Sequence, residues 1–122
     1  MASAAFFADT SFWIALTSRR DQYHERARAW SRHLLQAAVP LVTTEAVLWE
    51  WMNAMADTAT RGAAVEGYRR CHRDPQIEVV PFGSESIDSA LRLYEGRVDK
   101  NWSLTDCLSF VVIERRDLIH AL

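Results

Sequence analysis

Three acidic residues lie in apolar stretches where a charged side chain is unusual. Asp9 follows Phe-Phe-Ala, and after Thr-Ser the chain turns apolar again. Glu50 stands between Trp49 and Trp51, and Asp106 precedes the apolar run Cys-Leu-Ser-Phe-Val-Val-Ile. An ionised carboxylate without a partner is costly in such surroundings. We therefore expect each of the three to be protonated or to meet a cation.

Carboxylates that share one pocket repel each other and need a compensating positive charge. The chain has one lysine, Lys100, although arginine side chains could also serve. A hard divalent cation does this better, because Mg²⁺ binds one or two carboxylates together with waters and phosphate oxygens. Such a set is suited to metal-assisted hydrolysis of a phosphodiester bond.

Each acid also has a purely structural alternative. Residues 103–106 (Ser-Leu-Thr-Asp) are close to a capping box, in which the acid only closes the start of a helix. Asp9 before Thr-Ser is a plausible N-cap, and Glu50 could pair with an arginine. Glu45 has a reason to open its helix, since acids stabilise helix N-termini. Asp99 lies in a polar loop, where we expect it to be solvated.

Strands and helices are predicted to alternate along the chain. This order indicates a parallel sheet covered by helices on both faces. Sites in such sheets form at the carboxyl ends of the strands, where Asp9 is placed. The predicted strands are 5–8, 41–44, 77–82 and 118–122, and the predicted helices are 11–18, 21–38, 45–56, 61–73, 84–94 and 103–116.

The predicted helix 21–38 carries an apolar stripe. Tyr23, Ala27, Trp30 and Leu34 are spaced three or four residues apart. This spacing is typical of an amphipathic helix.

Composition and charge narrow the class of protein. With 122 residues, 49% hydrophobic and 25% charged, the chain fits one ordinary soluble domain. The net charge of −2 argues against a dedicated duplex-binding module. Arg69, Arg70 and Arg73 could follow a phosphate backbone, but such a run is more often an exposed helix face. Without a membrane-length apolar run or a signal peptide, we expect a cytoplasmic location.

Three segments together resemble a known family. DTSFWIAL begins at Asp9, LVTTEAVLWEWMNAM covers 41–55, and DKNWSLTDCLSFVVIERR covers 99–116. In this order they resemble the PIN-domain ribonucleases, and in particular the VapC toxins of bacterial toxin–antitoxin pairs. The resemblance extends over essentially the whole chain. It implies an α/β/α sandwich around a parallel sheet of about four strands, so that 1–122 would form a single PIN-like domain.

The resemblance also implies an activity and site residues. It implies an endoribonuclease that depends on Mg²⁺ or Mn²⁺ and acts on tRNA or other structured RNA. The family's acids fall on Asp9, Glu50 and Asp106, with Glu45 as second choice for the middle one. Thr10 or Ser11 resembles the small hydroxyl residue that supports the site, and Asp99 is an accessory candidate. The implied partners are a VapB-like antitoxin, whose C-terminal segment would lie over the pocket, and a second copy of the chain.

One departure from the family pattern affects these expectations. The family carries a fourth acid just after the last strand, and the sequence stops at Leu122, before that position. Asp117 precedes the strand and is a poor substitute. We therefore expect a C-terminally short domain that is a single-metal or a weakened nuclease. The alternative is a PIN scaffold without catalysis that binds a partner. A phosphotransferase with an aspartate nucleophile is disfavoured, because Ser11 occupies the place of its second acid.

Overall fold

The centre of the molecule is a parallel sheet of four strands. The computed structural model describes residues 3–122, and its strands are β1 (Ser3–Phe7), β2 (Leu41–Thr44), β3 (Ile77–Val80) and β4 (Leu118–Ala121). They are arranged in the order β3-β2-β1-β4, and every pairing is parallel. The predicted strands are confirmed, with β1 starting two residues earlier and β3 ending two residues earlier than expected.

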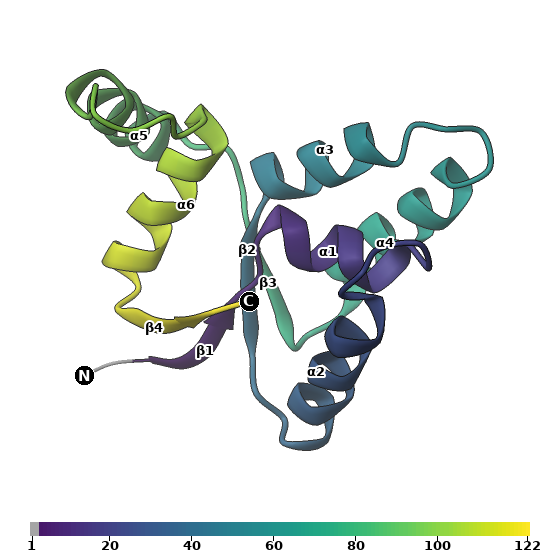
Figure 1. Cartoon of the computed structure of the whole chain (residues 1–122). Coiled ribbons are helices and arrows are strands. Elements are labelled where there is room, and N and C mark those ends of the chain that lie inside the picture. Colours follow the sequence, from purple (N-terminus) through teal and green to yellow (C-terminus); the bar gives the residue numbers. More distant parts are fainter. Residues whose placement is uncertain (1–2) are drawn as a thin grey trace.

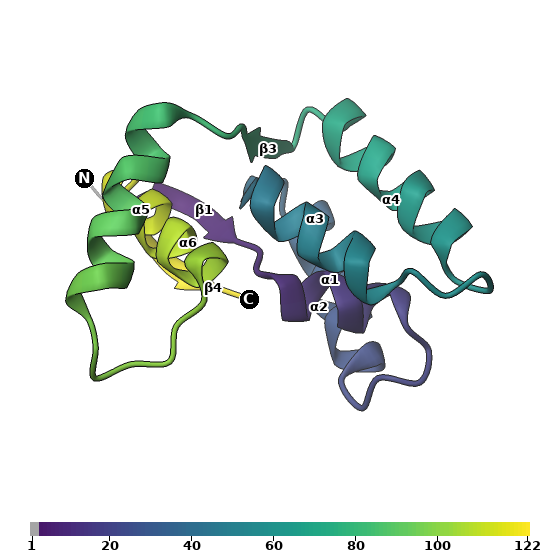
Figure 2. The same cartoon turned by 90° about the horizontal axis from the view of Figure 1, so that it is seen from above.

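Helices cover both faces of this sheet (Figures 1 and 2). Helices α1 to α4 lie on one face and helices α5 and α6 on the other, which confirms the predicted three-layer α/β/α architecture. No helix within residues 3–122 has the length and apolar character needed to cross a membrane. The helices are α1 (Thr10–Thr17), α2 (His24–Gln36), α3 (Glu45–Ala54), α4 (Arg61–Arg73), α5 (Ser84–Gly96) and α6 (Leu104–Arg115).

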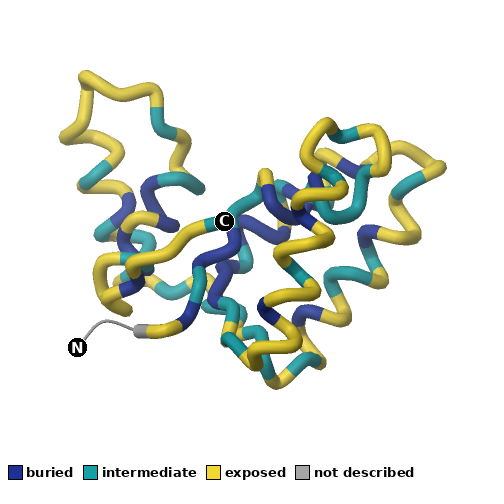
Figure 3. Tube along the Cα trace, turned by 60° about the horizontal axis from the view of Figure 1, so that its bottom comes forward, coloured by how far each residue is buried: buried dark blue, intermediate teal, exposed yellow. Residues whose placement is uncertain are grey.

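The main core lies between the sheet and the four-helix layer (Figure 3). Trp51 of α3 is 1% exposed and stacks on Trp13 of α1, with ring centroids 5.5 Å apart. Gly67 of α4 packs directly against this indole, because a Cβ atom at position 67 would lie 2.4 Å from Cη2 of Trp51. The tryptophans thus hold α1, α3 and α4 together, and a smaller apolar cluster joins α6 to α5 and α3.

The apolar stripe of α2 is only half buried. Ala27 and Leu34 are 6% and 3% exposed, whereas Tyr23 and Trp30 are 55% and 39% exposed. The predicted helix is confirmed, but its two aromatic residues do not lie in the core. Trp30 instead lies beside Phe6 of β1, with ring centroids 6.0 Å apart.

Candidate active site

Asp9 is held at the carboxyl end of β1. It is the N-cap of α1, and its Oδ1 accepts a 2.8 Å hydrogen bond from the backbone N–H of Thr10. The preceding residue, Ala8, is fixed on both sides, because its N–H donates to Val42 O and its carbonyl accepts from the hydroxyl of Thr43. These bonds to β2 determine where the turn leaves the sheet, and they hold the carboxylate of Asp9 at the strand end.

Glu50 reaches the same region from α3. This helix starts directly after β2, where Thr44 Oγ1 accepts a 3.0 Å hydrogen bond from the N–H of Val47. Glu50 lies one and a half turns into the helix, and its Oε2 accepts a 3.1 Å hydrogen bond from the Thr10 hydroxyl. Because Thr10 also donates its backbone N–H to Asp9, one residue orients both acids.

Asp106 belongs to a capping box at the start of α6. The N–H of Ser103 donates to Asp106 Oδ2 over 3.0 Å, and the N–H of Asp106 donates to Ser103 Oγ over 3.0 Å. The structural role predicted for this acid is therefore confirmed. The capping box involves only one of the two carboxylate oxygens of Asp106, because no hydrogen bond within residues 3–122 involves Oδ1.

The other two acids influence Asp9 electrostatically. Burial raises the pKa of Asp9 above its ordinary value of 3.8. The hydrogen bond from Thr10 opposes this shift, and the nearby charges of Asp106 and Glu50 add to the rise in pKa. Within residues 3–122, no arginine, lysine or histidine forms an ion pair with any of the three. The site therefore holds negative charge that no basic side chain within residues 3–122 neutralises.

The donor chemistry of these residues fits a hard divalent cation, which prefers carboxylate oxygens. Their spacing is wider than a closed coordination shell, since no three His, Cys, Asp or Glu side chains in the described part of the chain group tightly enough to hold one ion. The two observations are compatible, because Coulomb repulsion acts over longer distances than metal–oxygen bonds. The half-buried side chains would have to move closer together to hold one ion.

Two other candidate acids make their contacts elsewhere. Glu45 accepts a 3.0 Å hydrogen bond from the hydroxyl of Tyr68 and lies 2.7 Å from Nε2 of His72. It thereby ties α3 to α4 and is not joined to Asp9. Asp99 pairs with Arg97 in an exposed loop, at 3.0 Å. The expectation that Asp99 is solvated agrees with its exposure, but the structure does not bring either acid to the site.

Comparison with protein families adds an independent observation. Residues 6–121 match the PIN domain. The chain belongs to the PIN-domain family. The match includes all three acids and nearly the whole sheet, so the resemblance read from the sequence is confirmed at the level of the family.

A solved structure shows the same fold. The PIN domain described here superposes on VapC20 of Mycobacterium tuberculosis, a sarcin–ricin-loop-cleaving toxin, with a TM-score of 0.82 and 23% sequence identity. The match covers 96% of this chain and 87% of VapC20. At this level of identity the likeness concerns the fold. No curated protein matches the chain.

Beside the acids, the PIN domain has an apolar cleft of about 300 Å³. Glu50 lines it together with Trp49 and Phe82, whose rings meet edge to face at 6.4 Å between centroids. Both aromatic side chains are more than half exposed. The cleft also reaches Leu104 and Thr105, just before Asp106. An apolar group bound here would lie against two of the three acid-bearing helices.

The predicted basic residues lie apart from the acids. Arg69, Arg70 and Arg73 are exposed on α4, and Arg73 pairs with Glu66 at 3.2 Å. This agrees with the alternative that the run is an exposed helix face. A role in binding RNA stays a prediction.

Two features of the structure were missed in the sequence. The bond from Thr10 to Glu50 spans forty residues of chain and has no local signal. The exposed Tyr23 and Trp30 could have been noticed, because Arg26 stands between them at helical spacing, and a charged residue inside an apolar stripe marks a boundary with solvent.

Proposed function

We propose that this PIN domain is a VapC-like ribonuclease that cleaves RNA with the help of a divalent metal ion. The observation that carries the proposal is the pair of hydrogen bonds by which Thr10 holds Asp9 and Glu50 at one strand end, in a chain that matches the PIN domain. The raised pKa of Asp9, caused by burial and by the charges of Asp106 and Glu50, agrees with it. A cluster of carboxylates that no basic side chain neutralises favours a bound cation. When bound, Mg²⁺ or Mn²⁺ would neutralise phosphate charge and activate a water molecule.

The protein residues have separate roles in this proposal. Asp9, Glu50 and Asp106 would each provide carboxylate oxygen to the ion. Thr10 orients two of them through its N–H and its hydroxyl, and Ser103 orients the third through its N–H. Such supporting hydrogen bonds fix the ligands before the substrate arrives. A phosphate oxygen of the RNA would be a further ligand of the ion. The proposed substrate is cytoplasmic RNA such as tRNA.

Likeness to VapC toxins also supports the proposal of two protein partners. We propose a VapB-like antitoxin whose C-terminal segment covers the acids. The apolar cleft formed by Trp49 and Phe82 beside Glu50 would accept an apolar side chain of that segment. We also propose a homodimer, for which the exposed aromatic residues provide apolar surface.

The test is cleavage of RNA by the purified chain with Mg²⁺ or Mn²⁺, and with EDTA as a control. We expect Asp9→Asn, Glu50→Gln and Asp106→Asn each to lower the cleavage rate by at least a hundredfold. Glu45→Gln and Asp99→Asn are matched controls, because they remove the same charge from acids that pair elsewhere. Full activity in any of the first three variants would exclude that residue from the site.

A scaffold without catalysis is the second candidate. It is favoured by the spacing of the acids, which is too wide for one ion as they stand. In that case the chain would bind an antitoxin with normal affinity and cleave no RNA under any metal condition. Detectable cleavage that requires Asp9 would exclude this candidate.

A further inference from the structure

The apolar cleft beside Glu50 lies where the two helical layers meet. Helix α3 forms one wall of it, and α5 and α6 form the other. Helix α3 starts directly after β2, and Phe82, which also lines the cleft, follows the end of β3 by two residues. The cleft therefore lies at the carboxyl ends of the strands, where parallel sheets bind their ligands. We call it the α3–α6 cleft.

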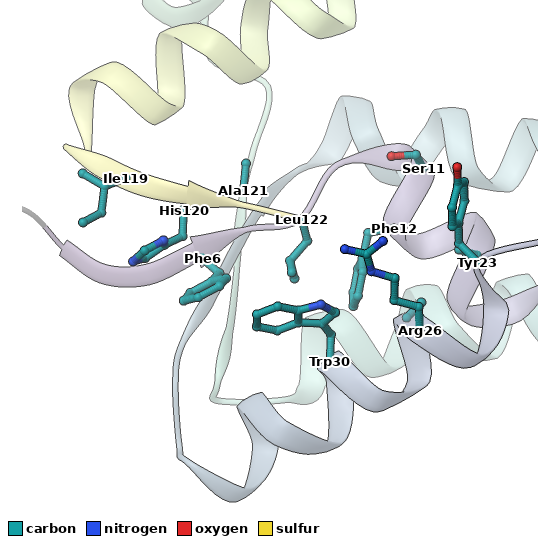
Figure 4. Close-up of a pocket in the computed structure, with 12 residues that line it drawn as sticks. Phe6, Ser11, Phe12, Tyr23, Arg26, Trp30, Ile119, His120, Ala121 and Leu122 are labelled. Carbon is teal, nitrogen blue, oxygen red and sulfur yellow. The ribbon is translucent and has the colours of Figure 1, made fainter.

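The largest cavity of the described residues has different surroundings. It measures about 670 Å³ and lies between α1, α2 and β4, with Phe6 and Trp30 among its lining residues (Figure 4). No aspartate or glutamate within residues 3–122 lines it. Glu50, by contrast, lines the α3–α6 cleft and accepts a hydrogen bond from Thr10, which also binds Asp9. A group bound in the α3–α6 cleft therefore lies next to the candidate active site.

Two accessible aromatic rings and a buried aliphatic floor form the α3–α6 cleft. The side chains of Trp49 and Phe82 are 59% and 52% exposed, whereas Ala90 and Leu108 are 1% and 6% exposed. The volume of about 300 Å³ is at the lower end of the range for ligand pockets. A flat, accessible indole ring in a cleft of this size is the form of surface on which a nucleobase stacks.

The α3–α6 cleft also contains polar side chains that are free to bind a ligand. Asn53 follows Trp49 by four residues in α3 and so shares its face of the helix, and Thr105 comes from the first turn of α6. Neither side chain makes a hydrogen bond within residues 3–122. No arginine or lysine of that range lines the cleft, which disfavours a phosphate group as its occupant. An amide and a hydroxyl beside an aromatic ring suit an uncharged, flat ligand with hydrogen-bonding edges.

We propose that the α3–α6 cleft binds one base of the RNA substrate beside the cleaved bond, and that Asn53 determines which base is accepted. Trp49 stacks on the base, and the amide of Asn53 forms hydrogen bonds with its edge. The amide has one acceptor oxygen and two N–H donors, so its pairing differs from base to base. This inference rests on the proposed ribonuclease function and names a residue that determines its specificity. The antitoxin side chain proposed for the same cleft would compete with the base.

The first experiment maps where the chain cleaves an RNA of randomised sequence in the presence of Mn²⁺, by sequencing the ends of the products. We expect the natural chain to favour one base at one position beside the cleaved bond. Asn53→Ala should reduce this preference about tenfold, in the range known for loss of a specific side-chain contact to a base. Asn101→Ala is the matched control, because Asn101 is the other asparagine of the chain and lies outside the cleft. It should leave the base preference unchanged.

The stacking role of Trp49 is tested by kinetics on one RNA. Trp49→Leu should raise KM about tenfold, in the range known for loss of a stacked base, with kcat nearly unchanged. Trp49→Phe keeps an aromatic ring and should stay close to the natural KM. The matched control is Tyr94→Leu, an exposed tyrosine of α5 outside the cleft. Mn²⁺ affinity in the RNA-free chain should be the same in all these variants, which separates a base contact from damage to the acids.

Three results would overturn the inference. One is a natural chain with no base preference, and another is the same preference in Asn53→Ala as in the natural chain. The third is an unchanged KM in Trp49→Leu. If Trp49→Leu also dissociates a dimer of the chain while KM stays the same, the cleft is an interface between copies.

Failure of the inference is distinguishable from failure of the proposed function. If only the cleft assignment is wrong, the cleft variants cleave RNA with the natural KM and base preference. If the natural chain cleaves nothing, the cleft is tested by binding alone, with four RNA octamers that each contain one kind of base, in EDTA. The phosphates are the same in all four, so the ratios of their affinities report contacts to bases. These ratios should narrow about tenfold in Asn53→Ala, and equal ratios in both proteins would overturn the inference.

Discussion

The hydroxyl of Thr10 donates a 3.1 Å hydrogen bond to Oε2 of Glu50, and so joins the first turn of α1 to the middle of α3. The backbone N–H of the same residue donates to Asp9. A single threonine therefore orients two of the three acids on which the proposed chemistry depends.

Replacing Thr10 tests this arrangement. Thr10→Val keeps the shape and the backbone N–H but removes the bond to Glu50. Loss of a supporting bond to a metal ligand typically costs 10- to 100-fold in affinity or activity, so we expect RNA cleavage to fall at least tenfold. Thr10→Ser, which keeps a hydroxyl, should retain most of the activity. Equal rates for the valine and serine variants would show that the bond is not used.

The two roles of Asp106 can be separated at the capping box. Ser103→Ala removes the cap hydroxyl and should cost about 1 kcal/mol in the free energy of unfolding, with cleavage nearly unchanged. Asp106→Asn should cost a similar amount of stability and abolish cleavage. Chemical denaturation and an RNA cleavage assay on both variants measure the two effects. If Ser103→Ala loses as much activity as Asp106→Asn, Asp106 affects cleavage only by capping α6 and has no direct role in the chemistry.

The raised pKa of Asp9 predicts a pH dependence of stability in metal-free protein. A carboxyl group whose pKa is higher in the folded chain favours folding while it is protonated. The contribution of Asp9 to the free energy of unfolding is complete below pH 3.8, which is the ordinary pKa. It is lost as the pH rises through the raised pKa of Asp9. Ionised Asp9 should therefore destabilise the fold at neutral pH.

Asp9→Asn should accordingly unfold at a higher temperature than the natural chain at neutral pH in EDTA. The asparagine can still cap α1. The difference in unfolding temperature should vanish below pH 3.8, where both side chains are neutral. Glu95→Gln on the exposed surface of α5 controls for the change in net charge. A lower unfolding temperature for Asp9→Asn at neutral pH would contradict the electrostatic account.

Two glycines of α4 provide a matched test of the core. Gly62→Ala meets no atom within 4 Å and should stabilise the helix by about 0.5–1 kcal/mol. Gly67→Ala would place its Cβ 2.4 Å from the buried Trp51 ring. We expect it to lower the free energy of unfolding by about 1–3 kcal/mol, the usual cost of overpacking. Similar stabilisation by both variants would show that Trp51 can move aside.

The fold could be predicted because its signals are local. Each strand is a short apolar run, and Asp9 and Ser103 cap helices through residues at most three positions away. The placement of Asp9 at a strand end followed from the parallel sheet alone. The PIN resemblance then assigned two further acids to Glu50 and Asp106. The family is confirmed, and the assignment of these residues stays a prediction.

Tertiary contacts could not be predicted in the same way. Glu45 and Glu50 lie in the same helix, and only the packing of α4 reveals that Glu45 faces Tyr68 and His72. The periodic stripe of α2 was equally ambiguous. Spacing predicts a common face but not which segment packs against it, and no segment within residues 3–122 buries Tyr23 or Trp30.

The most direct measurement of the central claim is a titration of Mn²⁺ into the RNA-free chain, with free ion detected by electron paramagnetic resonance. We expect one ion per chain, with affinity at least tenfold lower in Asp9→Asn, Glu50→Gln and Asp106→Asn and unchanged in Glu45→Gln and Asp99→Asn. If neutralising Asp9, Glu50 or Asp106 leaves Mn²⁺ affinity unchanged, the three carboxylates do not share an ion, and the account is contradicted.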